Sequence, residues 1–192
     1  MATRSSARAR PVTRRGARPH LHPPDTLWTT LAEDLTPWPV VNRAFGGSTL
    51  AACVHFFERL VPLCAPGSLV LYAGDNDLGD GRPVHAVIAS FHALLAKVTA
   101  QLAPIPVAFL TIKPSPARLA LRPAIEAVNE AARMALAAHP HGLFIDTFQP
   151  MLRRDGQPCL TLFADDGLHL SAEGYRLWTQ IIRAYRLPLF AP

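Results

Sequence analysis

The chain has 192 residues, 49% of them hydrophobic, and a formal net charge of +5 at pH 7. This length and apolar content suit one compact domain with a sizeable core. No apolar run approaches the roughly 20 residues that a membrane-spanning helix needs, so we expect no membrane span.

The positive charge is concentrated in residues 1–24, which hold six arginines and no acidic residue. From residue 25 onward there are 13 basic and 14 acidic residues, so the rest of the chain is close to neutral. This distribution disfavours nucleic-acid binding by the folded part. Because residues 1–24 are rich in Arg, Ala and Pro, we expect a disordered tail there and a single domain over residues 25–192.

Helices and strands are predicted to alternate after the tail. Apolar spacing and capping residues predict helices at 25–35, 49–62, 84–98, 123–138 and 172–186, and strands at 40–41, 68–73, 105–112 and 143–146. The two longest strands are continuous apolar runs, typical of strands buried on both faces of a parallel sheet. The pattern predicts an open α/β sheet with helices on both faces, in which sites form at the carboxyl ends of the strands.

Three polar loops are expected at that edge of the sheet. Asn42–Gly47 leads into a helix start, whose free N–H groups can bind developing negative charge. Gly74–Asp77 follows a buried strand and offers a side-chain N–H from its asparagine. Asp166–His169 places a carboxylate three residues before a histidine, the side chain best suited to accept a proton near neutral pH. Taken singly, each loop also fits an ordinary turn or helix cap.

In order and spacing, Asn42–Ser48, Gly74–Asp77 and Asp166–His169 resemble the second, third and fifth sequence blocks of the SGNH hydrolases, also called GDSL-type esterases and lipases. The resemblance covers residues 26–186. It implies a flavodoxin-like three-layer α/β/α sandwich with a parallel sheet. The activity it implies is acyl transfer to water from a small-molecule ester or thioester, without a metal or organic cofactor.

The same resemblance implies a role for four residues. Gly47 and Asn76 would donate hydrogen bonds to the oxyanion, His169 would be the general base, and Asp166 would orient it. These four are the candidate site residues of the chain.

The first block of that family, which supplies a nucleophilic serine at the end of the first strand, has no counterpart here. By analogy with relatives, the serine should fall about five residues before Trp28, where this sequence has Pro23. Proline offers neither a nucleophile nor an N–H group. We therefore expect the first strand to be missing or replaced by the disordered tail. Translation of residues 1–24 in a wrong reading frame would explain this.

Other hydroxyl groups are poor substitutes for that serine. Thr26 lies only two residues before Trp28 and is β-branched, Ser48 is explained as a helix cap, and Ser5 and Ser6 lie in the tail. Two hypotheses follow. One is a family esterase whose turnover is impaired as the sequence stands, and the other is a catalytically inactive protein that binds an acyl or glycan ligand in the same cleft.

The three cysteines are odd in number and form no CxxC pair: Cys53, Cys64 and Cys159. This disfavours a disulfide framework or a zinc site, and free thiols indicate a reducing compartment, so we expect a cytoplasmic protein. A metal site built from acidic residues of the second and third loops is disfavoured, because no ligand spacing supports it. The oligomeric state is not indicated by the sequence.

Overall fold

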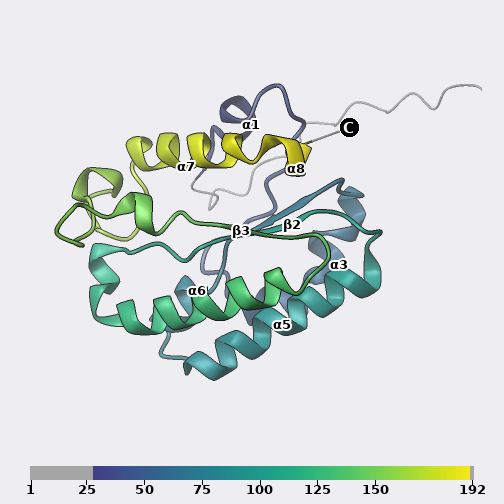
Figure 1. The fold of residues 1–192 in the computed structure, drawn as a ribbon, viewed down its shortest axis with the longest axis horizontal. Helices are drawn as coiled ribbons and strands as arrows, with labels where there is room; N and C mark the ends of the chain where they lie inside the picture. Colours follow the sequence, from purple (N-terminus) through teal and green to yellow (C-terminus); the bar gives the residue numbers. More distant parts are fainter. Residues whose placement is uncertain (1–27, 191–192) are drawn as a thin grey trace, which may run out of the picture.

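The computed structural model describes residues 28–190. In this part of the chain a parallel sheet of three strands lies between two layers of helices (Figure 1). The strands are β1 (Leu69–Leu71), β2 (Val107–Leu110) and β3 (Gly142–Ile145), hydrogen-bonded in the order β1-β2-β3. The fold class expected from the sequence, a flavodoxin-like α/β/α sandwich with a parallel sheet, is therefore confirmed. The expected tail and the place of the first strand lie outside the described residues.

Strand β2 separates two cores, because successive side chains of a strand point to opposite faces. Val107 and Phe109 belong to one core, and Ala108 and Leu110 belong to the other. All four side chains are buried, as the continuous apolar run predicts.

Helices from different parts of the chain cover the two faces (Figure 1). The first core is covered by α2 (Leu50–His55), α3 (Phe57–Leu60), α5 (Val84–Gln101) and α6 (Arg122–Ala137). The second is covered by α1 (Leu31–Asp34), α7 (Ala172–Ala184) and α8 (Arg186–Phe190). Short helices complete the connections: η1 (Pro62–Cys64), α4 (Asp75–Gly79), η2 (Pro116–Leu121), η3 (Gln149–Met151) and η4 (Leu160–Leu162). None of the helices between residues 28 and 190 is both long and apolar enough to cross a bilayer.

Three of the expected elements differ in the structure. Of the helix expected at 25–35, the described residues contain only α1 (Leu31–Asp34). The helix expected at 49–62 is interrupted at Phe56, whose ring packs edge-on against Phe45 with centroids 6.3 Å apart, while Phe57 enters the core. The prediction of a strand at Val40–Val41 is wrong: these two residues are not part of a strand, and Val41 is 62% exposed. A pair of β-branched residues forms a strand only where a neighbouring strand supplies its hydrogen bonds.

Side chains continue the pairing of β2 and β3 beyond the ends of the strands. The Thr147 N–H donates to Oγ1 of Thr111 at 2.9 Å, and Oγ1 of Thr147 donates to the Thr111 carbonyl at 3.0 Å. Both residues are buried. This pairing fixes where the chain leaves β2 at the carboxyl edge, and the polar segment that begins at Lys113 starts there.

Candidate active site

The loop Asp166–His169 is a turn built around the Asp166 carboxylate. Oδ1 of Asp166 accepts hydrogen bonds from the backbone N–H groups of Leu168 at 2.8 Å and His169 at 2.9 Å. Oδ2 of the same carboxylate contacts Nδ1 of His169. Gly167 lies between them at φ +64°, a backbone conformation that glycine adopts without strain. The carboxylate therefore contacts Nδ1 of the His169 ring, and the other ring nitrogen, Nε2, does not contact it.

The surroundings of Asp166 favour its charged form. The backbone N–H groups of Leu168 and His169, followed by the His169 imidazole, lower the pKa of Asp166 to about 2. An ionised carboxylate at Nδ1 fixes the ring orientation and stabilises the imidazolium that forms when Nε2 accepts a proton. The side chains of His169 and Asp166 are 45% and 48% exposed, so the pair is accessible to a substrate.

The loop before α2 brings Gly47 close to Asn76. A turn closed by the Ser48 N–H to the Phe45 carbonyl at 3.3 Å places Gly47 at φ +67°. Nδ2 of Asn76 donates to the Ser48 carbonyl at 3.0 Å, next to Gly47 in the chain. The adjacent Asp77, fully buried, accepts the Leu50 N–H at 2.7 Å through Oδ2. Two neighbouring side chains of α4 therefore hold the same loop.

Gly74 allows this arrangement at the end of β1. Its φ is +108°, and a Cβ atom at this position would lie 2.7 Å from Cδ1 of Ile112. Only glycine fits both the conformation and the space. The sharp turn starts α4 directly after the strand and sets the positions of Asp75, Asn76 and Asp77.

The segment 115–118 connects the two pairs of candidate residues. The Ala117 N–H donates to the Gly167 carbonyl at 3.0 Å, and Oγ of Ser115 donates to the Leu168 carbonyl at 3.4 Å. From the same segment, Nη2 of Arg118 donates to Oδ1 of Asn76 at 3.2 Å. The structure thus brings Gly47 and Asn76 together, brings Asp166 and His169 together, and links the two pairs through one loop.

A buried charged cluster lies beside Asn76, and the sequence reasoning did not identify it. Nζ of Lys113 lies 2.6 Å from Oδ2 of Asp75, and Nη1 of Arg118 pairs with the other carboxylate oxygen. The Lys113 ammonium also donates to the Tyr72 hydroxyl at 2.9 Å. The side chains of Lys113 and Asp75 are only 6% and 9% exposed. One signal was present in the sequence, since Lys113 directly follows a buried apolar strand. Arg118 gave none.

Burial and charge act in opposite directions on the pKa values of this cluster. Burial raises the pKa of Asp75, but the charges of Lys113 and Arg118 outweigh it and hold the pKa below its ordinary value. Burial lowers the pKa of Lys113 in spite of the neighbouring carboxylate. The pKa of Tyr72 is raised, first by burial and then by Asp75. The Asp75 carboxylate is therefore the fixed negative charge of the cluster. Between residues 28 and 190 no set of three or more His, Cys, Asp or Glu side chains is arranged to hold a metal ion.

The nucleophile expected from the family is not found among the described residues. Between residues 28 and 190, no serine or threonine hydroxyl forms a hydrogen bond with the His169 imidazole. The sequence offers Ser48 or Thr49 as the cap of α2, and in the structure the cap is Thr49, whose side chain accepts the Ala52 N–H at 3.1 Å. Pro23 and the other hydroxyl residues considered from the sequence, Ser5, Ser6 and Thr26, lie outside the described residues.

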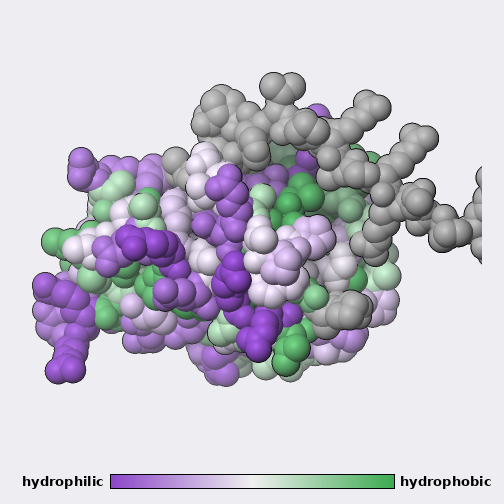
Figure 2. Space-filling view, turned by 90° about the horizontal axis from the view of Figure 1, so that it is seen from above, coloured by the Kyte–Doolittle hydropathy of each residue, from purple (hydrophilic) through white to green (hydrophobic). Residues whose placement is uncertain are grey.

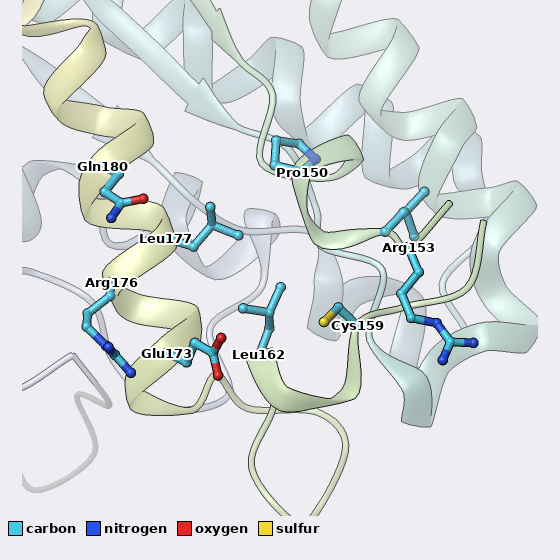
Figure 3. Close-up of a pocket in the computed structure, with 9 residues that line it drawn as sticks. Pro150, Arg153, Cys159, Leu162, Glu173, Arg176, Leu177 and Gln180 are labelled. Atoms are coloured by element: carbon cyan, nitrogen blue, oxygen red, sulfur yellow. The ribbon is translucent and has the colours of Figure 1, made fainter. Parts of the chain in front are cut away.

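In the described part of the chain, none of the four candidate residues lines either of two hollows on the surface. The larger, of about 470 Å³, lies between α7 and the chain from η3 to η4 and has an apolar floor bordered by Arg153, Glu173 and Arg176 (Figure 3). The smaller, of about 220 Å³, includes Pro116, which also faces Gly167 of the Asp166–His169 loop. The surface seen from above mixes hydrophilic and apolar side chains (Figure 2).

Fold and site together define a three-layer α/β/α protein with a histidine and carboxylate pair at the carboxyl edge of its sheet. The chain belongs to the GDSL-like lipase/acylhydrolase family, whose family model matches residues 13–177. This match starts earlier than residue 26, where the resemblance seen in the sequence begins, and includes part of the segment that we expected to be a tail.

Solved structures of similar fold agree with this family. A Streptococcus pneumonia protein provisionally named a platelet activating factor is 23% identical, with a TM-score of 0.74 over 82% of this chain and 78% of its own. A lipase/acylhydrolase from Enterococcus faecalis is 21% identical, with a TM-score of 0.60 over 73% of this chain and 71% of its own. A Clostridium thermocellum family 3 carbohydrate esterase is 19% identical, with a TM-score of 0.61 over 74% of this chain and 67% of its own. A comparison with curated protein sequences gives no match.

Proposed function

We propose that this protein hydrolyses an ester or thioester bond of a small-molecule substrate. In the proposal His169 is the general base, Asp166 orients it, and the Gly47 N–H and the Asn76 side-chain N–H stabilise the oxyanion. The observation that carries the proposal is the contact between Nδ1 of His169 and a carboxylate fixed by two backbone N–H groups. This arrangement leaves Nε2 as the proton acceptor.

The proposed reaction begins when Nε2 of His169 accepts a proton from an attacking hydroxyl within about 3 Å. Negative charge then develops on the carbonyl oxygen of the substrate. Nδ2 of Asn76 carries two hydrogens and donates one of them to the Ser48 carbonyl. The second hydrogen is available to stabilise the negative charge on the substrate oxygen. The imidazolium then gives the proton to the leaving alcohol or thiol as the bond between the acyl carbon and this group breaks. Where the attacking hydroxyl belongs to the protein, a water activated by His169 in the same way cleaves the acyl-enzyme and releases the acid. The acyl group must reach the edge of the sheet between His169 and Asn76, so we assign the substrate to this edge and not to the larger hollow.

We expect slow turnover from the sequence as it stands, because Pro23 occupies the position predicted for the nucleophile. Serine proteases that lack a triad member retain roughly 10³- to 10⁴-fold acceleration over water from binding and the oxyanion hole. Water activated by His169, or a hydroxyl from outside residues 28–190, would supply the nucleophile. The free thiols Cys53, Cys64 and Cys159 support a cytoplasmic location as part of the proposal.

The test combines hydrolysis of p-nitrophenyl acetate with labelling by a fluorophosphonate probe on the full chain. We expect hydrolysis that falls at least about tenfold in H169A, in D166N and in N76A. H85A is the matched control, because His85 is exposed on α5. Hydrolysis that is equal in H169A and H85A would contradict the proposal. The absence of both hydrolysis and labelling, together with affinity for an acyl or glycan ligand in calorimetry, would favour the inactive binding protein instead.

A further inference from the structure

Arg118 lies between the buried charged cluster and the candidate oxyanion donor. Its Nη2 donates to Oδ1 of Asn76 at 3.2 Å, and its Nη1 pairs with the buried carboxylate of Asp75. The Arg118 side chain is 15% exposed, so most of the guanidinium is held against the protein. Asp75 is itself fixed from the other side by Lys113 at 2.6 Å. Asp75 thus holds the Arg118 guanidinium in place, and the same guanidinium contacts Asn76, the next residue in the chain.

The contacts of Asn76 define the orientation of its amide group. Oδ1 accepts from Arg118, and Nδ2 donates to the Ser48 carbonyl at 3.0 Å. If the amide were flipped, its NH₂ would face the guanidinium, where both groups are donors. Its oxygen would then face the Ser48 carbonyl, where both groups are acceptors. The flipped amide would lose both hydrogen bonds. Arg118 and Ser48 together therefore permit one orientation only.

The end of α4 leaves room for the guanidinium. A Cβ atom at Gly79 would lie 2.6 Å from Nη2 of Arg118, 2.7 Å from Cζ and 2.9 Å from Nε. The backbone of Gly79 has no positive φ that would require glycine for its conformation. The absence of a side chain at Gly79 thus allows the guanidinium to lie flat against α4.

We propose that Arg118 is a positioning residue for the oxyanion hole: it holds the Asn76 amide so that the second hydrogen of Nδ2 is directed at the substrate oxygen. This inference rests on the proposed function, and it goes beyond it by assigning a role to a residue outside the four candidates. A charged donor on Oδ1 also polarises the amide, which strengthens the Nδ2 donor. The Asp75 carboxylate keeps the guanidinium in place and balances its charge in a buried site.

The kinetic test compares R118M with wild type in hydrolysis of p-nitrophenyl acetate by the full chain. We expect kcat to fall about 10- to 100-fold, less than or equal to the loss in N76A, with KM changed less than about threefold. In the N76A background, R118M should cause less than about a twofold further loss, because its effect acts through Asn76. An undiminished kcat in R118M, or an equal loss in both backgrounds, would overturn the proposal.

Two further variants separate positioning from folding. G79A keeps Arg118 but displaces its guanidinium, and we expect a smaller loss of kcat in the same direction. R133M is the matched control, since Arg133 is an exposed arginine on α6 whose partner among residues 28–190 is Glu130 on the same helix. It should leave kcat within about twofold. If thermal melting shows that R118M does not fold, the test rests on G79A. In that case a kcat of G79A equal to the kcat of R133M overturns the proposal.

A second readout does not depend on turnover. The side-chain amide signal of Asn76 in a ¹H–¹⁵N NMR spectrum is identified by its loss in N76A. We expect this signal to shift in R118M and its protons to exchange with water at least about fivefold faster, with no change in R133M. If wild type shows no hydrolysis, the proposed function fails, and the NMR result alone decides the positioning role. An unchanged Asn76 amide signal in R118M overturns the positioning role of Arg118.

Discussion

The Asn129 side chain binds both backbone polar groups of Ile112. Its Oδ1 accepts the Ile112 N–H at 2.8 Å, and its Nδ2 donates to the Ile112 carbonyl at 3.0 Å. Asn129 lies on α6 and is 7% exposed, and Ile112 lies just beyond the end of β2. The asparagine takes the place of a neighbouring strand at the point where the chain leaves the sheet. It therefore fixes the start of the segment that carries Lys113 and Arg118.

Replacing Asn129 should cost stability through these two hydrogen bonds. N129A leaves the buried N–H and carbonyl of Ile112 without partners, at about 1–3 kcal/mol for each group. N129L fills the volume but leaves the same groups unpaired, so it should not recover the loss. Urea denaturation monitored by circular dichroism measures both variants. A free energy of unfolding for N129L equal to that of wild type would show that packing, and not hydrogen bonding, matters at this position.

Gly74 should be intolerant of a single methyl group. Its φ of +108° is unfavourable for alanine, and the added Cβ would lie 2.7 Å from Cδ1 of Ile112. Such strain costs about 1–3 kcal/mol. G67A is the matched control, because a Cβ atom there meets nothing within 4 Å. We expect thermal melting to show a lower Tm for G74A and a much smaller change for G67A. Equal melting temperatures would be incompatible with the tight turn before α4.

The sequence predicts the local parts of this protein well. The apolar run of β2 is continuous, the apolar residues of the long helices recur at helical spacing, and the Asp166–His169 turn lies within four residues. Such features depend on neighbours in the chain, so they are readable without the fold. The division of the expected helix 49–62 at Phe56 depends on packing against Phe45, which no local pattern indicates.

The charged cluster beside Asn76 could not be predicted in the same way. Asp75 is 38 residues from Lys113, and Asn76 is 42 residues from Arg118. Their contact depends on β1 and β2 being adjacent and parallel, with Leu69 beside Val107. A buried ion pair is also costly unless its partners are in place, so the composition of either segment alone argues against burial. The link from the cluster to the Asp166–His169 loop likewise emerges only in the folded chain.

The Asp166 carboxyl should titrate far below the ordinary range. Its pKa of about 2 arises first from the Leu168 and His169 N–H groups and only then from the imidazole. Because the pKa is lower in the folded chain, ionised Asp166 stabilises the fold above about pH 4, and this contribution is lost as the pH falls through about 2. A ¹³C NMR titration of the carboxyl carbon measures the midpoint. In H169A both backbone N–H groups remain, so the midpoint should rise but stay below the ordinary pKa of an aspartate, 3.8. A midpoint near 4 in wild type would contradict the turn geometry.

Cys53 should react much more slowly with alkylating reagents than Cys64. Burial, followed by the charge of Asp77, raises the pKa of the Cys53 thiol to about 11. The thiolate is the nucleophile, and at pH 8 a thiol with this pKa is ionised in about one molecule in a thousand. Cys64 is exposed in η1.

Iodoacetamide at pH 8 tests this difference, because trypsin cleavage after Arg59 separates the two cysteines into different peptides for mass spectrometry. We expect Cys64 to be modified at least about tenfold faster in the folded chain, and the two rates to become similar in concentrated guanidinium, where burial is lost. D77N should accelerate Cys53 modestly, since it removes the second cause of the raised pKa. Modification of Cys53 at the rate of Cys64 in the native chain would mean that α2 does not pack against the first core as the structure describes.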